Sequence, residues 1–243
     1  MAWIVASLFF TIALVYSSVG FGGGSMYLAV LSFTGLSQDS LRITALICNA
    51  LVTGAGSWHF LREYRLTPSR VIPLLACSIP ACILTSSIKV SDTIFFWILA
   101  IALIVAGLIM LIRIKPINAE SQKNPWYFLP LTIAIGALAG ITGIGGGVYL
   151  SPFLTLRNWG TAKEISAVCA LFIFVNSLAG LLTRVISFNA EIVMQDSYLF
   201  LLAGVGGFIG SYLSSKKWPN TRIRKVTALI LMLAGLRILI SQF

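Results

Sequence analysis

Two stretches decide how this chain can fold: SSVGFGGGSMYLAV, from Ser17 to Val30, and AGITGIGGGVYLSP, from Ala139 to Pro152. Each places four glycines within five positions, Gly20–Gly24 and Gly143–Gly147, inside an apolar run that otherwise favours unbroken helix. A glycine in a helix interior costs about 1 kcal/mol relative to alanine. The two clusters therefore predict two interruptions in otherwise helical segments.

The composition predicts that these interruptions lie within a membrane. The chain has 243 residues, of which 58% are hydrophobic and 10% charged, whereas a soluble domain carries about 25% charged residues. Too few polar side chains remain to cover a water-facing surface, so we expect an all-α polytopic membrane protein embedded in the lipid bilayer. The net charge of +10 is then typical of Lys and Arg retained on the cytoplasmic side, and it does not indicate a nucleic-acid partner.

Six apolar segments approach the length of about 20 residues that a membrane-crossing helix needs. They are Ile43–Trp58, Val71–Ile88, Thr93–Ile112, Ile165–Thr183, Ser197–Ser215 and Val226–Phe243. Two charge-free stretches, Met1–Gln38 and Pro125–Leu156, are longer and contain the glycine clusters. Each is too long for one helix and short for two full crossings joined by a turn.

The order of these segments indicates a tandem duplication. GFGGG matches GIGGG at an offset of 123 residues, and LICNALVTG aligns with IFVNSLAGL, which pairs Asn49 with Asn176. We expect a first repeat over 1–112, a cytoplasmic linker over 113–124 and a second repeat over 125–243. Each repeat has four segments, a glycine-broken one followed by three spans.

The positive charges predict how the second broken segment is threaded. If Pro125–Leu156 enters and leaves on the same side, 13 Lys and Arg residues lie on one side of the membrane and 4 on the other. The 13 are Arg62, Arg65, Arg70, Arg113, Lys115, Lys123, Arg157, Lys163, Lys216, Lys217, Arg222, Arg224 and Lys225, and the 4, in loops or near span ends, are Arg42, Lys89, Arg184 and Arg237. If it crosses completely, the division is 8 against 9. The positive-inside rule favours a re-entrant hairpin, which inverts the second repeat relative to the first and places both termini outside. No charge precedes the first cluster, so its hairpin is assigned by analogy.

Glycine-broken helices suit the binding of a small anion. A helix that restarts after such a break presents unpaired N–H groups and the positive end of its dipole, and glycine lets a ligand approach the backbone closely. We expect two such ends to bind an oxyanion near the midplane without a positive side chain. Close helix packing is the alternative use of these glycines, and the one we favour for Gly206 and Gly210. The expected site residues are Gly20, Gly22, Gly23, Gly24, Ser25, Asn49, Gly143, Gly145, Gly146, Gly147, Asn176 and Ser177.

Other side chains are less suited to chemistry. An interhelical hydrogen bond is an equally good interpretation of Asn49 and Asn176, and further hydroxyls could come from Thr44, Thr53 and Ser166. The four cysteines form no CxxC motif and no metal-ligand spacing, so we expect no metal and no cofactor. No Asp or Glu falls within a predicted span, which argues against ion coupling through a buried carboxylate.

The repeated motifs resemble a known family. VGFGGGSMYLAVLSFTGL with RITALICNALVTGAGSWHFLR, and TGIGGGVYLSPFLTLRNWG with EISAVCALFIFVNSLAGLLTR, are similar to the sulfite exporter TauE/SafE family of membrane permeases. The resemblance implies an exporter of sulfite or an organosulfonate in the bacterial cytoplasmic (inner) membrane. One departure is that SMYLAV lacks the proline of VYLSP, and another is that Cys48 precedes the first asparagine.

Two functions of other classes compete with transport. An intramembrane enzyme needs a nucleophile–base pair or a metal cluster, and the predicted spans offer neither. A helical scaffold subunit would tolerate changes in the glycine clusters. The sequence leaves open the particular anion, the driving force and the formation of a homodimer.

Overall fold

The computed structural model is all-helical in the residues it describes, which are 2–31, 38–64, 66–88, 91, 97, 100–101, 103–105, 107–108, 129–157, 159–188, 197–217 and 219–240. The helices are α1 (Ala2–Ser17), α2 (Gly24–Leu31), α3 (Gln38–Glu63), α4 (Pro68–Ser86), α6 (Leu129–Thr142), α7 (Gly147–Leu156), α8 (Ala162–Phe188), α9 (Ser197–Lys217) and α10 (Asn220–Ile240). Within the described residues, α4, α8 and α9 are long and apolar enough to cross a membrane, and part of α1 and the whole of α6 and α7 are shorter apolar helices.

Five of the six predicted spans correspond to α3, α4, α8, α9 and α10. The helices α3 and α8 have 26 and 27 residues, so each extends several residues beyond the span predicted from hydropathy. The difference arises because polar residues continue a helix after its apolar stretch has ended. Most of the remaining span, 93–112, and the whole linker, 113–124, lie outside the described residues.

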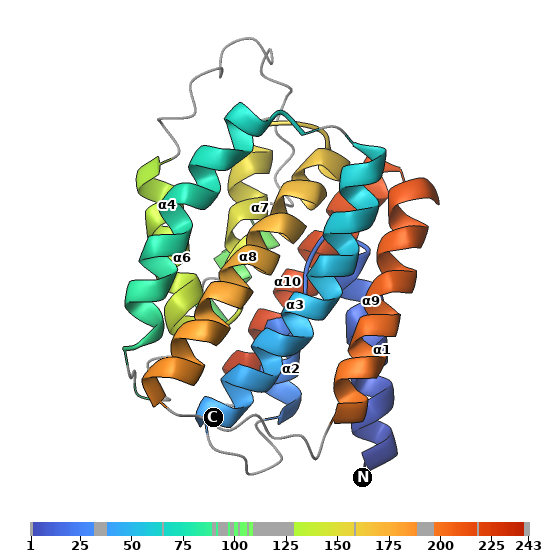
Figure 1. Cartoon of the computed structure of the whole chain (residues 1–243). Coiled ribbons are helices and arrows are strands. Elements are labelled where there is room, and N and C mark those ends of the chain that lie inside the picture. Colours follow the sequence, from blue (N-terminus) through green and yellow to red (C-terminus); the bar gives the residue numbers. More distant parts are fainter. Residues whose placement is uncertain are drawn as a thin grey trace.

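The chain reverses direction at both glycine clusters (Figure 1). The helix α1 rises from the end of the bundle that holds both termini, and α2 runs back toward that end before α3 rises again. In the second half α6 descends, α7 returns upward and α8 descends. Both glycine-broken segments therefore form hairpins inside the bundle.

The helices pack through glycine at several crossings. A Cβ on Gly210 of α9 would overlap the Leu14 carbonyl of α1, and one on Gly206 would meet Phe10 O. In the same way, a Cβ on Gly136 of α6 would overlap the backbone of Ser78 on α4. The packing interpretation of Gly206 and Gly210 is confirmed. The centre of the bundle is the antiparallel pair α3 and α8, which contact each other along their length.

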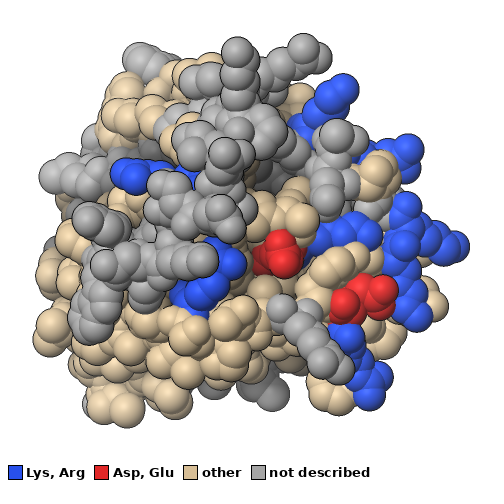
Figure 2. Space-filling view, turned by 90° about the horizontal axis from the view of Figure 1, so that it is seen from above, with Lys and Arg blue, Asp and Glu red and all other residues tan. Residues whose placement is uncertain are grey.

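Positive side chains gather at the end opposite the termini, seen from above in Figure 2. The described Lys and Arg residues on the helix ends and loops there are Arg62, Arg70, Arg157, Lys163, Lys216, Lys217, Arg222 and Lys225. Arg65, Arg113, Lys115 and Lys123, which were also expected on this side, lie outside the described residues.

The other end of the bundle differs from the sequence prediction. Arg42 and Arg184 were expected in loops or at span ends, but they lie inside α3 and α8 and are only 4% and 1% exposed. The prediction failed because hydropathy ends a span at the first charge, whereas a packed helix can continue with a buried arginine that finds backbone acceptors.

Candidate functional site

Both glycine clusters interrupt a helix where the sequence predicted. We call Gly20–Gly24 the first glycine loop and Gly143–Gly147 the second glycine loop; each lies between a helix that ends and one that restarts at its last glycine. Positive φ angles occur at Gly20 (82°), Gly23 (89°), Gly143 (69°), Gly145 (79°) and Gly146 (77°). Side chains other than glycine adopt this region rarely, so these five positions require glycine for conformational reasons.

The restarting helices leave amide groups unpaired. The Met26 and Tyr27 amides donate to Gly23 O, and the Tyr149 and Leu150 amides donate to Gly146 O. The amides over 22–25 and 144–148 have no hydrogen-bond acceptor within the described part of the chain, and all of these residues are buried. Buried N–H groups are almost always paired in proteins, so these loops can accept an anion or ordered water.

Asn49 of α3 joins the two loops. Its side chain is fully buried and lies against the first glycine loop, where a Cβ on Gly22 or Gly24 would overlap its amide group. Its Nδ2 donates to the Ile144 carbonyl of the second glycine loop at 3.1 Å. Its Oδ1 has no hydrogen-bond partner in the described structure. One side chain therefore contacts both interruptions of the helices.

Asn176 of α8 does not have the equivalent contacts. Its Nδ2 donates to Ser78 Oγ of α4 at 3.1 Å and to the Phe172 carbonyl at 2.9 Å. The second glycine loop instead lies against Ile173 and Ser177, which a Cβ on Gly145 would meet at 2.7 Å. Asn176 lies between these two residues in the sequence of α8, but its side chain bonds to α4 and not to the loop.

The crossing of α3 and α8 nevertheless brings these polar groups to one level. Along this interface Gly54 faces Phe174, and Gly180 faces Leu46. In this antiparallel register, Asn49 lies at about the same level along the helix pair as Ser177. The Ser177 hydroxyl and the Asn176 Oδ1 are buried and have no hydrogen-bond partner among the described residues. Both side chains therefore retain polar atoms that could contact a ligand near the loops.

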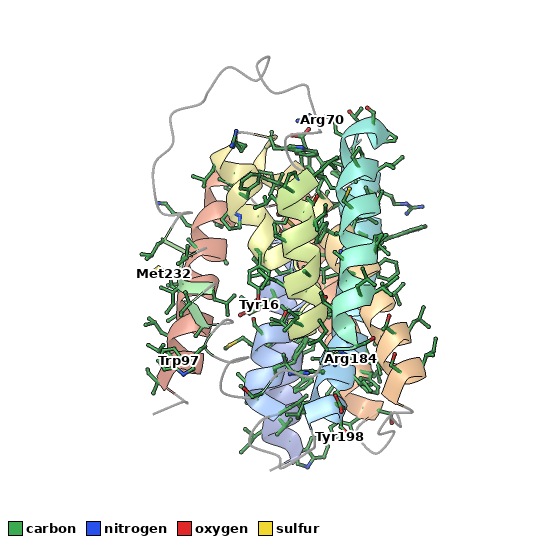
Figure 3. All side chains as sticks on the ribbon, turned by 90° about the vertical axis from the view of Figure 1, so that its left-hand side faces the viewer. Tyr16, Arg70, Trp97, Arg184, Tyr198 and Met232 are labelled. Carbon is green, nitrogen blue, oxygen red and sulfur yellow. The ribbon has the colours of Figure 1, made fainter. Side chains whose placement is uncertain are left out.

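Two tyrosines beside the loops were not predicted from the sequence. Tyr16, at the end of α1 and labelled in Figure 3, has its hydroxyl next to Ser25, although neither group reaches hydrogen-bond geometry. Tyr149 Oη on α7 also lacks a partner in the described structure. The sequence does contain a signal for them, because a tyrosine lies within four residues of each glycine cluster.

Arg42 and Arg184 also lie beside the second glycine loop. A Cβ on Gly143 would contact the Arg42 side chain at 3.5 Å, and Arg184 Nη2 donates to the Gly140 carbonyl at 2.8 Å. The sequence predicted a site without positive side chains, and the structure places two buried arginine side chains next to this loop. The signal in the sequence was an Arg directly beside each apolar run that contains an asparagine: Arg42 precedes the run of Asn49, and Arg184 follows the run of Asn176.

The other candidate groups have local roles. The hydroxyls of Thr53 and Ser166 donate to backbone carbonyls four residues earlier in their own helices. Among the described residues, no His, Cys, Asp or Glu cluster could hold a metal ion. A surface groove of about 540 Å³ lies on α3 and α9, lined by Leu51, Phe200, Leu201, Gly204, Val205 and Phe208. Its apolar lining does not suit an anion.

Comparison with known proteins covers the whole chain. The family model described as Sulfite exporter TauE/SafE matches residues 5–238. A protein of Sinorhizobium fredii named "Probable membrane transporter protein y4hK" is similar, with 31% identity over 240 residues that cover 97% of each chain. A "Probable membrane transporter protein" of Haemophilus influenzae is 25% identical over 250 residues, covering 91% of this chain and 92% of its own. No solved structure matches the chain.

Proposed function

Because the chain belongs to the sulfite exporter TauE/SafE family, we propose that it is a secondary transporter that exports a small sulfur oxyanion, such as sulfite or an organosulfonate. The family and the matched relatives are membrane transporters and not enzymes. The intramembrane enzyme considered from the sequence is therefore set aside. The identity of the anion and the site that binds it belong to the proposal.

The substrate site in this proposal is the space between the two glycine loops. The observation that carries it is the set of unpaired, buried amides over 22–25 and 144–148. An anion at this place would receive hydrogen bonds from backbone donors and would lie at the positive ends of α2 and α7. Asn49 and Ser177 contribute polar side chains, since both are buried and contact the loops. Ser25 and Asn176 complete the polar set.

The proposed architecture has two inverted repeats, over 1–112 and 125–243, joined by a cytoplasmic linker over 113–124. Support comes from the packing: α1 lies on α9 as α6 lies on α4, and α3 pairs with α8. It also comes from the opposite directions in which equivalent helices run in Figure 1. Many secondary transporters combine inverted repeats with discontinuous helices that bind substrate at the midplane. Alternating access would then be a rocking of one repeat against the other.

The proposed orientation places the positively charged end in the cytoplasm and both termini outside, in the bacterial inner membrane. The charge distribution supports it, because the described Lys and Arg that are exposed on helix ends lie at the end opposite the termini. Such a bias is typical of cytoplasmic loops. Reporter fusions at Lys123 and Lys163 should report the same compartment; opposite compartments would reject the re-entrant hairpin.

The decisive experiment blocks the amides without breaking the helix. In Ser25→Asp a carboxylate lies in the first turn of α2, where negative charge stabilises a helix, and it occupies the donors that the anion needs. We expect sulfite efflux from proteoliposomes to fall at least tenfold while the melting temperature stays the same or rises. A control for the added charge, Ser197→Asp, places a carboxylate at an exposed position in the first turn of α9 and should transport normally.

Other outcomes of this experiment separate the alternatives. Sulfite flux in wild-type protein but equal flux in Ser25→Asp would reject the glycine loops as the site. Flux of chloride or sulfate in place of sulfite would reject the assigned substrate. A scaffold subunit, the remaining alternative, predicts no flux of any anion and a normal melting temperature in both variants.

A further inference from the structure

The outer face of α3 and α9 combines an apolar groove with an aromatic and basic end. The two helices lie side by side and run in the same direction, so their C-terminal ends lie together, opposite the chain termini (Figure 1). The groove of about 540 Å³ that Leu51 and Phe208 help to line has the volume of a ligand site, about 300–1,000 Å³. At Gly204, which also lines it, an added Cβ would meet no atom within 4 Å. The groove therefore has room for a ligand at this position.

Toward its C-terminal end, each of the two helices carries an aromatic side chain followed by a cation. Arg62 Cζ lies 4.3 Å from the ring centroid of Trp58 on α3, and Lys216 Nζ lies 5.0 Å from that of Tyr212 on α9. Both aromatic side chains are exposed, at 57% and 42%. Trp and Tyr are enriched where membrane proteins meet the lipid headgroups. The two cations are therefore at the depth of the headgroup region.

His59 of α3 connects the groove with these two cations. Its ring packs edge-on against Phe208 of the groove, with 4.5 Å between centroids, and against Tyr212 at 5.6 Å. It is close enough to both Arg62 and Lys216 to interact with them electrostatically. Neither cation forms an ion pair within the described part of the chain. Two exposed positive charges thus lie around one end of the groove and are free to bind an anionic group.

The length of this face matches a lipid tail within one leaflet. Twelve residues separate Gly204 from Lys216, which is about 18 Å along a helix. Half of the hydrocarbon core of a bilayer is about 15 Å thick. A tail that starts beside the cations would therefore reach the groove without leaving its own leaflet.

We propose that this face binds one anionic phospholipid, with an acyl chain in the groove of α3 and α9 and the headgroup phosphate between Arg62 and Lys216. Guanidinium and ammonium groups bind phosphate oxygens through charge-assisted hydrogen bonds. This lipid site is separate from the glycine loops and does not depend on which anion is transported. A second copy of the chain fits this face less well, because copies inserted in the same orientation would bring their cations together, and like charges repel.

The test is native mass spectrometry of the full chain in detergent, titrated with dioleoyl phosphatidylglycerol or dioleoyl phosphatidylcholine. Each cation near a membrane surface should strengthen the binding of an anionic lipid about fivefold. We therefore expect wild-type protein to bind phosphatidylglycerol at least fivefold more tightly than phosphatidylcholine, and Arg62→Gln/Lys216→Gln to lose this preference. The matched control, Arg222→Gln/Lys225→Gln on α10, removes the same two charges from the same end of the bundle and should keep it.

A second variant tests the groove without changing the charge. Gly204→Leu places a side chain in the open space and should weaken the binding of both lipids at least fivefold, at an unchanged melting temperature. Equal affinity of wild-type protein for the two lipids would overturn the proposal, as would an equal loss of preference in the α10 control. Unchanged binding in Gly204→Leu would reject the groove as the tail site. A wild-type dimer that Gly204→Leu converts to a monomer would show that a second copy occupies the groove instead.

Discussion

The two glycine loops have nearly the same sequence and different surroundings. The first, GFGGG, lies against the amide of Asn49, and the second, GIGGG, lies against the apolar side chain of Ile173 and the hydroxyl of Ser177. Gly22 and Gly145 are equivalent in sequence, but only Gly145 has a positive φ. The comparison teaches that glycine is required at Gly22 mainly by a neighbouring side chain, and at the equivalent Gly145 also by the backbone conformation.

This difference predicts that a substitution at only one of these two positions can be compensated by a second change. Gly145→Ala combines a strained φ with overlap of Ile173, so we expect a loss of about 2–4 kcal/mol in the free energy of unfolding and no sulfite flux. Gly22→Ala should be nearly as harmful, but a smaller residue at 49, as in Gly22→Ala/Asn49→Ser, should restore part of the stability. Thermal unfolding in detergent measures both effects.

The control for these variants is Gly204→Ala on α9, whose Cβ would meet no atom within 4 Å. It should leave flux unchanged and raise stability by up to about 1 kcal/mol. Rescue of Gly145→Ala by Ser177→Gly would contradict the assignment of its cost to the backbone.

The two asparagines give the second comparison, with a smaller expected effect. Asn49→Ala and Asn176→Ala each remove buried hydrogen bonds, which costs about 1–3 kcal/mol. Only Asn49 bonds to a glycine loop, so we expect its variant to lose at least tenfold in sulfite flux. The Asn176 variant, which mainly loses the link to Ser78, should lose less than threefold. Equal losses of flux at equal stability would show that the asymmetry of contacts has no functional meaning.

The smallest effect is expected at a single hydroxyl. Ser177 Oγ is buried beside the second glycine loop without a hydrogen-bond partner in the described structure, so Ser177→Ala should not lower the melting temperature. If this hydroxyl contacts the anion, the KM for sulfite should rise about three- to tenfold. Ser214→Ala, which removes another unpartnered hydroxyl near the C-terminal end of α9, is the matched control. A KM that rises equally in both variants would argue against a contact.

Much of the fold follows from local features of the sequence. Hydropathy located five helices because a membrane-crossing helix needs about 20 apolar residues wherever it packs. The glycine clusters located both interruptions because the conformational cost of glycine depends on the residue itself and its neighbours in the chain. These signals reach only a few residues along the chain, so helix ends such as those of α3 were displaced by several residues.

The contacts within the site could not be predicted in this way. Alignment of the repeats matched Asn49 with Asn176, but one bonds to a loop 95 residues away and the other to Ser78 on α4. The partners depend on the rotation and crossing of α3 and α8, which side-chain packing along the whole interface decides.

The sequence by itself determined that this protein is helical, lies in a membrane and breaks two of its helices with glycine, because composition and backbone preference act locally. Only the tertiary structure decided that one asparagine bonds to the second loop while lying against the first, and that Arg42 and Arg184 are buried beside the second loop. In the sequence, a charged residue next to an apolar run indicates the end of a span. In the folded protein, Arg184 lies inside a helix because a backbone carbonyl accepts its hydrogen bond. This acceptor, the Gly140 carbonyl, lies 44 residues away on another helix, and only folding brings it near.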